Sequence, residues 1–128
     1  MNRRIIITAS ILGMLGVIAG AFAAHGLKPR LTLQQLEIWH TAVQYQFYHV
    51  FALLFLSTFT SSENRMVRIA CYLFTLGILF FSGSLYFLAC RDLLGWSWLS
   101  TFGLITPLGG LMFIAGWVTL ALAAFRDK

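Results

Sequence analysis

The chain has 128 residues, of which 59% are hydrophobic and 10% are charged. Soluble domains carry about 25% charged residues, so this composition excludes an ordinary soluble domain and indicates a membrane protein. The formal net charge of +5 is no sign of a nucleic-acid partner, because Lys and Arg in a membrane protein mainly set its orientation.

Four apolar runs predict an all-α integral membrane protein, a four-helix bundle in a single domain. The predicted spans are residues 5–24, 38–60, 69–90 and 100–125. The first span is free of charged residues for twenty positions, about the length that crosses a bilayer. Because further spans follow it, we interpret it as a retained helix and not as a signal peptide.

Small residues recur along the first span every three or four positions, at Ala9, Gly13, Gly16, Gly20 and Ala24. Such a stripe lets helix backbones approach closely in lipid, where packing drives association. We therefore predict that this face packs against another helix.

The fourth apolar run is interrupted near its start. Pro107 is followed by Gly109 and Gly110, and a third glycine, Gly116, lies further along. Proline removes a helical hydrogen bond, so a kink or a broken first turn is expected here. The three glycines are predicted helix-packing positions.

The second run is unusually polar for a membrane span. Thr32 and Gln35 have the spacing of a capping box, so the helix should begin near Leu33. Trp39 is expected at headgroup depth, where belt aromatics lie. Polar side chains at membrane depth are costly, and they usually face the protein interior, a cavity or a partner.

A helical wheel separates the polar residues of this run into two groups. One side carries Glu37, His40, Thr41, Gln44 and Tyr48, and the other carries Tyr45, Gln46 and His49. We predict that the second group faces protein. His49 lies deep in the span, so its ring should be neutral, with one donor and one acceptor to satisfy.

Two readings of this second group remain open. In the functional reading, Tyr45, Gln46 and His49 form a buried site for a lipid head group, a quinone carbonyl or a proton. In the structural reading, they make interhelical hydrogen bonds that hold the bundle together. Tyr45 is expected to serve one nitrogen of His49. The polar candidates for the remaining bonds are Ser82, Ser84, Tyr86 and Thr106.

The other histidines and the cysteines predict no metal or redox site. His40 and His49 are nine residues apart on one helix and point in roughly opposite directions. His25 suits the end of a helix, with a pH-sensing or headgroup role as the alternative. Cys71 and Cys90 lie nineteen residues apart in one apolar run, too far for a disulfide. No cofactor motif is recognised.

Basic residues predict the orientation. The amino terminus, the second loop and the carboxyl terminus share one side of the membrane. That side carries Arg3, Arg4, Arg65, Arg68, Arg126 and Lys128, and the other side carries Lys28, Arg30 and Arg91. Six against three predicts that both termini are cytoplasmic.

Four blocks of the sequence resemble one family. They are residues 20–28 (GAFAAHGLK), 39–49 (WHTAVQYQFYH), 81–86 (FSGSLY) and 105–110 (ITPLGG), followed by Gly116 and Trp117. They resemble domain-of-unknown-function family 423, small bacterial inner-membrane proteins related to animal transmembrane protein 256. The resemblance implies four spans and no established reaction. It adds a set of residues of interest: His25, Tyr45, Gln46, His49, Ser82, Ser84, Tyr86, Thr106 and Pro107.

The sequence favours a non-enzymatic membrane protein in contact with the lipid bilayer. We expect an accessory, scaffold or oligomeric bundle component without a cofactor, because one chain supplies no catalytic pair or metal-ligand set. The alternative is a lipid- or quinone-binding protein, or a small permease, with a buried polar site around His49. Homo-oligomerisation or a larger membrane complex is a possible partnership in either case.

Overall fold

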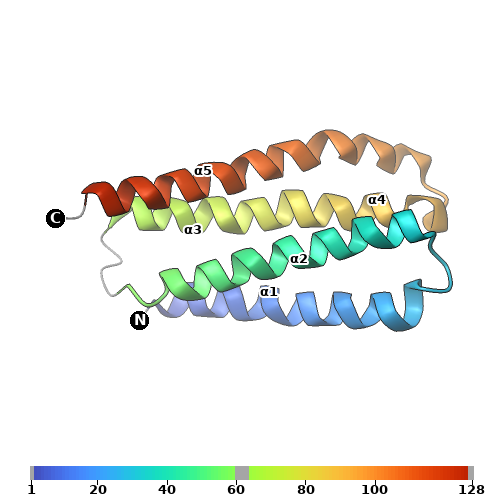
Figure 1. Ribbon diagram of the computed structural model, residues 1–128, viewed down its shortest axis with the longest axis horizontal. Helices are drawn as coiled ribbons and strands as arrows, with labels where there is room; N and C mark the ends of the chain where they lie inside the picture. Colours follow the sequence, from blue (N-terminus) through green and yellow to red (C-terminus); the bar gives the residue numbers. More distant parts are fainter. Residues whose placement is uncertain (1, 60–63, 127–128) are drawn as a thin grey trace.

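The computed structural model describes residues 2–59 and 64–126, and the regular structure in these ranges is helical. The elements are α1 (Arg3–Phe22), the π-helical turn η1 (Ala23–Leu27), α2 (Leu33–Leu56), α3 (Arg65–Gly77), the π-helical turn η2 (Ile78–Ser82), α4 (Gly83–Leu94), the 3-10 segment η3 (Ser97–Leu104) and α5 (Ile105–Arg126). The predicted all-α four-helix bundle is confirmed (Figure 1).

These elements join into four rods. α1 continues through η1, α3 continues through η2 into α4, and η3 continues into α5. Three rods, Arg3–Leu27, Arg65–Leu94 and Ser97–Arg126, are long and apolar enough to cross a membrane. The fourth rod, α2, has 24 residues and is about 36 Å long, but its polar side chains make it the least apolar of the four.

Side-chain caps set the starts of three helices. Asn2 and Asn64 each accept hydrogen bonds from two backbone N–H groups in the first turns of α1 and α3. Thr32 Oγ1 accepts from the Gln35 backbone N–H at 3.2 Å, and the Gln35 side chain accepts from the Thr32 N–H at 3.0 Å. The predicted capping box is confirmed, and α2 begins at Leu33 as expected.

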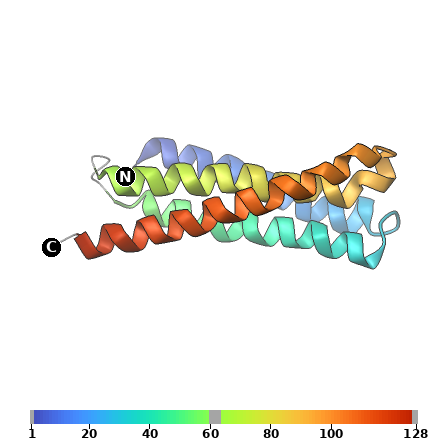
Figure 2. The same ribbon diagram turned by 90° about the horizontal axis from the view of Figure 1, so that it is seen from above.

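Helix α2 holds the two halves of the bundle together. It packs along α1 and also against α4, while α5 packs along α3. Figure 1 shows α1 and α2 in one half and the α3–α4 rod with α5 in the other. Figure 2 shows α5 crossing over the α3–α4 rod. One cluster of buried apolar residues surrounds Leu53 and Phe74, and a second surrounds Leu27 and Trp39 nearer the other end.

Hydrogen bonds between α1 and α2 give the depth register of these antiparallel helices. Trp39 Nε1 donates to the Ala19 carbonyl at 2.9 Å, and Gln46 Nε2 donates to the Leu12 carbonyl at 2.7 Å. These two bonds place Gln44 level with the middle of the charge-free first span. The polar part of α2 therefore lies level with the middle of the apolar first rod.

The surroundings of Trp39 and Pro107 differ in part from what the sequence predicts. Trp39 does not lie in a surface belt: it is buried, its N–H bonds to α1, and its ring centre lies 4.6 Å from that of Tyr86. Near Pro107 the expected interruption of the helix is a change of helix type. Pro107 lies in the first turn of α5, where a missing N–H costs nothing, and the chain changes from 3-10 to α-helical geometry at Ile105.

Some expectations fall outside the described residues. These are the end of the predicted span 38–60, the first part of the second loop, and Lys128 in the orientation count. Within the described ranges, α1 begins and α5 ends at the same end of the bundle (Figure 1).

Candidate functional site

His49 is the most buried ionisable group of α2, and both of its ring nitrogens have partners. Nδ1 lies 2.7 Å from the Tyr45 backbone carbonyl, and Nε2 accepts a hydrogen bond from Trp117 Nε1 at 3.1 Å. Because a carbonyl can only accept, the proton of a neutral ring belongs on Nδ1. The ring's donor is thus satisfied by a carbonyl of α2 itself, and its acceptor is satisfied by Trp117 of α5.

Aromatic rings cover the faces of this imidazole. The Phe113 ring stacks on it with centres 3.6 Å apart and planes at 8°, and the Phe74 ring centre lies 5.3 Å away. His49 is accordingly 4% exposed. Phe74 also packs on Trp117, with ring centres 4.9 Å apart. The histidine therefore belongs to a packed aromatic cluster that joins α2, α3 and α5.

Gln46 connects three rods with one side chain. Its Nε2 bonds to the Leu12 carbonyl of α1, and its Oε1 accepts a hydrogen bond from the Tyr86 hydroxyl of α4 at 2.6 Å. The side chain is 4% exposed. Tyr86 therefore pairs with Gln46, an interhelical hydrogen bond of the kind that the structural reading expected, and not with His49.

The serine and threonine candidates also find partners other than His49. Ser82 Oγ donates to the Ala42 carbonyl of α2 at 2.7 Å. Ser84 Oγ and Thr106 Oγ1 lie 2.6 Å apart and join α4 to α5. The prediction that these residues complete the hydrogen bonds of His49 is wrong, because Trp117 occupies the available nitrogen.

Two candidates lie apart from this network. Tyr45 is 39% exposed; its backbone carbonyl serves His49, while its ring packs on Phe81 with centres 4.8 Å apart. Tyr45 therefore serves one nitrogen of His49 as expected, through its backbone carbonyl and not through its side chain. His25 is exposed and lies in η1, more than four helical turns from the level of His49. The structure does not bring it into the same site.

The stripe of small residues on α1 faces α2. A Cβ atom added at Gly16 would lie 2.8 Å from the Phe47 ring, whereas one at Gly13 or Gly20 would have 3.5 Å or 3.9 Å to its nearest neighbour on α2. Ala9 is fully buried in the same interface. The approach of the two helices is thus closest at Gly16.

The glycines of α5 face the α3–α4 rod. A Cβ atom at Gly109 would collide with the backbone of Phe81, and one at Gly116 would lie 2.6 Å from the Phe74 ring. At Gly110 the nearest atom is 3.8 Å away. Gly77 of α3, which the sequence analysis did not select, receives the Phe113 ring in the space its missing side chain leaves.

Sequence reasoning missed the partners Trp117, Phe113 and Phe74. A signal was available for the first, because a tryptophan N–H inside a membrane helix needs an acceptor. The two phenylalanines carry no such signal in a chain with twelve of them.

The buried polar side chains of the described residues satisfy one another's hydrogen bonds or bond to backbone groups. Across residues 2–59 and 64–126, no buried side-chain nitrogen or oxygen lacks a hydrogen-bond partner. In the same ranges, no group of three or more His, Cys, Asp and Glu residues gathers into a metal site. What the arrangement does is tie α2 to all three other rods.

Comparison with known proteins agrees with the resemblance seen in the sequence. The family model described as "Protein of unknown function (DUF423)" matches residues 19–110. A UPF0382 membrane protein of Staphylococcus haemolyticus is 40% identical over 94% of both chains. One of Bacillus subtilis is 40% identical over 94% of this chain and 95% of its own. One of Haemophilus influenzae is 35% identical over 100% of this chain and 98% of its own.

No solved structure matches the chain. The matched relatives are all named as membrane proteins, which agrees with three rods that are apolar enough to cross a bilayer. The chain therefore belongs to the DUF423 family of bacterial membrane proteins of unknown function.

Proposed function

We propose that this protein is a non-enzymatic component of the bacterial inner membrane that works as an oligomer, self-associating through the outer face of α2. Four rods cross the membrane, and both termini are cytoplasmic. The observation that supports self-association best is Gln44. Its polar side chain is exposed and lies level with the middle of the charge-free run of α1.

Gln44 has no place in the closed network inside the bundle. It is exposed and makes no side-chain hydrogen bond to another residue in the described part of the chain. A carboxamide in hydrocarbon without partners loses the hydrogen bonds that water gave it. A second helix that offers a donor and an acceptor recovers them, and polar residues of this kind hold membrane helices together.

The residues around Gln44 form a seam suited to a second helix. The seam consists of Glu37, Thr41, Gln44, Tyr48, Phe51 and Phe55. Alternating steps of four and three residues are the spacing of helices that pack with a left-handed crossing. Tyr48, Phe51 and Phe55 are 56%, 61% and 58% exposed, so the bundle itself leaves them uncovered.

A second copy of the chain is the simplest partner for this seam. In a two-fold symmetric contact, each residue near the axis faces its own copy. Gln44 would then face Gln44, and each amide can donate to and accept from the other. An identical side chain therefore supplies the complementary groups without any further protein.

The alternative site around His49 receives less support. Both imidazole nitrogens are occupied and Phe113 covers one face at 3.6 Å, so a quinone or head group would have to displace packed side chains. We assign His49 to holding the bundle together.

Cysteine cross-linking tests the proposal. In a Cys71→Ala/Cys90→Ala background, Gln44→Cys should form a disulfide-linked dimer when membranes are oxidised. Ile114→Cys is the matched control, because Ile114 is 61% exposed on α5, away from the seam. Gln44→Leu should weaken self-association in lipid, measured by energy transfer between labelled copies.

Thr119→Val controls for the loss of a polar group, since the Thr119 hydroxyl already bonds to the Ala115 carbonyl of its own helix at 2.7 Å. It should leave self-association unchanged. A protein that stays monomeric in lipid, or a Gln44→Leu variant that associates like the original, would contradict the proposal.

A further inference from the structure

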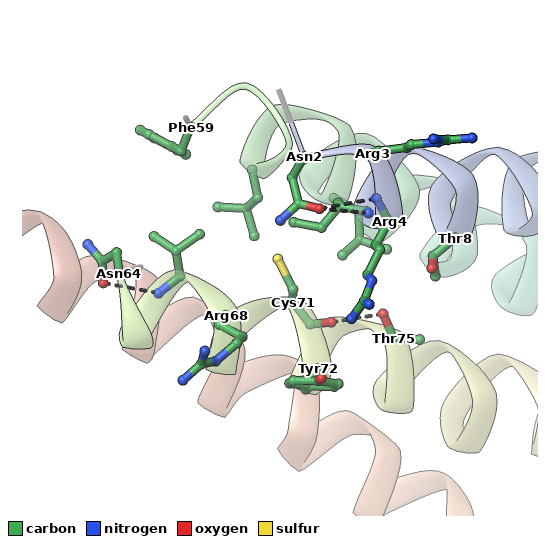
Figure 3. A pocket seen from close by; sticks show the side chains of 14 residues that line it. Asn2, Arg3, Arg4, Thr8, Phe59, Asn64, Arg68, Cys71, Tyr72 and Thr75 are labelled. Atoms are coloured by element: carbon green, nitrogen blue, oxygen red, sulfur yellow. Dashed lines mark hydrogen bonds between the residues drawn. The ribbon is translucent and has the colours of Figure 1, made fainter. Parts of the chain in front are cut away.

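We propose that the cavity between the first turns of α1 and α3 is a binding site for an anionic phospholipid. The cavity has a volume of about 660 Å³ and lies where the two halves of the bundle separate, beside the end of α2 (Figure 3). Arg3, Arg4 and Arg68 line it, and no acidic residue does so among the described residues.

The arginines lie at the depth of lipid head groups. Arg4 immediately precedes the charge-free run that starts at Ile5, and Arg68 immediately precedes the one that starts at Ile69. Figure 3 shows the Arg4 side chain extending from α1 toward α3, while Arg3 runs along α1. Arg4 thus reaches the cavity from α1, and Arg68 lines it from α3, with its side chain extending away from α1.

These positions are unfavourable for the helices themselves. The amino-terminal end of a helix carries partial positive charge, so basic side chains in the first turn are repelled. Arg4 and Arg68 both occupy such turns, capped by Asn2 and Asn64, which also line the cavity. In the described part of the chain, neither arginine has a salt bridge that offsets this repulsion.

The wall of the cavity toward the bundle interior is apolar. Leu53 and Leu56 of α2 and Val67 of α3 contribute to it, with exposures of 1%, 1% and 9%. A free phosphate ion gains nothing from such a wall. A phospholipid has a phosphodiester for the arginines and acyl chains for the apolar side chains, so it matches both parts of the lining.

A lipid titration with matched charge variants tests the site. The purified full chain in neutral detergent is titrated with phosphatidylglycerol, with phosphatidylcholine or with inorganic phosphate, and binding is followed by native mass spectrometry and by the melting temperature. Phosphatidylglycerol should bind and raise the melting temperature, and the other two should not. Each arginine removed should weaken phosphatidylglycerol binding about fivefold.

The test variant is Arg4→Gln/Arg68→Gln, and the control is Arg65→Gln/Arg126→Gln, which removes the same charge at the same end but outside the cavity. The test variant should lose about 25-fold in phosphatidylglycerol affinity. Its melting temperature without lipid should not fall, because the removed charges oppose the helix dipoles. The control should keep the affinity.

Three results would overturn the site. Equal losses in both double variants would mean diffuse attraction of anionic lipid to a basic surface. An equal effect of inorganic phosphate would mean an ion site. If the test variant binds phosphatidylglycerol with unchanged affinity, Arg4 and Arg68 do not bind the lipid. If the double variant fails to fold, Arg68→Gln alone should still show the fivefold loss.

Discussion

The bond between Trp117 and His49 joins α2 to α5 inside a cluster of aromatic rings. Removing one partner leaves the other unpaired in apolar surroundings, at a cost of about 1–3 kcal/mol. His49→Leu should therefore lower the free energy of unfolding by about that amount, measured by SDS unfolding in mixed micelles. His49→Gln retains a donor and an acceptor and should cost less.

A double-mutant cycle isolates this bond. Trp117→Phe removes the donor, so the added effect of His49→Leu should be smaller in that background by about 0.6–1.7 kcal/mol. If the two losses simply add, the bond contributes nothing and His49 acts only through packing.

At the residue scale, the sequence predicted which side chains point into the bundle better than it predicted their hydrogen-bond partners. The helical wheel placed Tyr45, Gln46 and His49 on the side predicted to face protein, and Gln46 and His49 are buried there, whereas Tyr45 is 39% exposed. The partner Trp117 lies 68 residues away, and which residues of α5 meet α2 depends on how the rods cross. Helical periodicity carries no information on that crossing.

At the scale of elements, glycine positions control how closely the rods approach. Gly109→Ala places a methyl group against the backbone of Phe81, which cannot rotate away as a side chain can. The variant should lose about 1–3 kcal/mol of stability and melt at a lower temperature. Gly110→Ala is the control, because its methyl group has 3.8 Å to the nearest atom.

A Gly110→Ala variant that melts as low as Gly109→Ala would show that helix flexibility matters and close approach does not. On α1, the same reasoning makes Gly16 the sensitive position, because the Phe47 ring lies closer to it than any residue of α2 lies to Gly13 or Gly20. The small-residue pattern revealed the interface, but its tightest point depends on which side chains α2 sets opposite.

The two π-helical turns could not be predicted. η1 and η2 each insert a wider turn into a long helix, and the second ends at Ser82, whose hydroxyl reaches the Ala42 carbonyl. Nothing in the composition of these segments separates them from ordinary helix.

At the scale of the whole molecule, an even number of crossings returns the chain to its starting side. A cysteine added after Lys128 should resist a membrane-impermeant maleimide in intact cells and react once the cells are permeabilised. In contrast, Lys28→Cys in the first loop should react from outside. The reverse pattern would contradict the predicted orientation.

The chain is made from its amino terminus, so α2 enters the membrane before most of its partners exist. Leu12 is already in place for Gln46, but Tyr86 follows Gln46 by 40 residues and Trp117 follows His49 by 68. The polar side chains of α2 therefore gain their last hydrogen-bond partners only after α4 and α5 have been made. A chain whose synthesis stops before α5 lacks Trp117, so Nε2 of His49 has lost its hydrogen-bond donor.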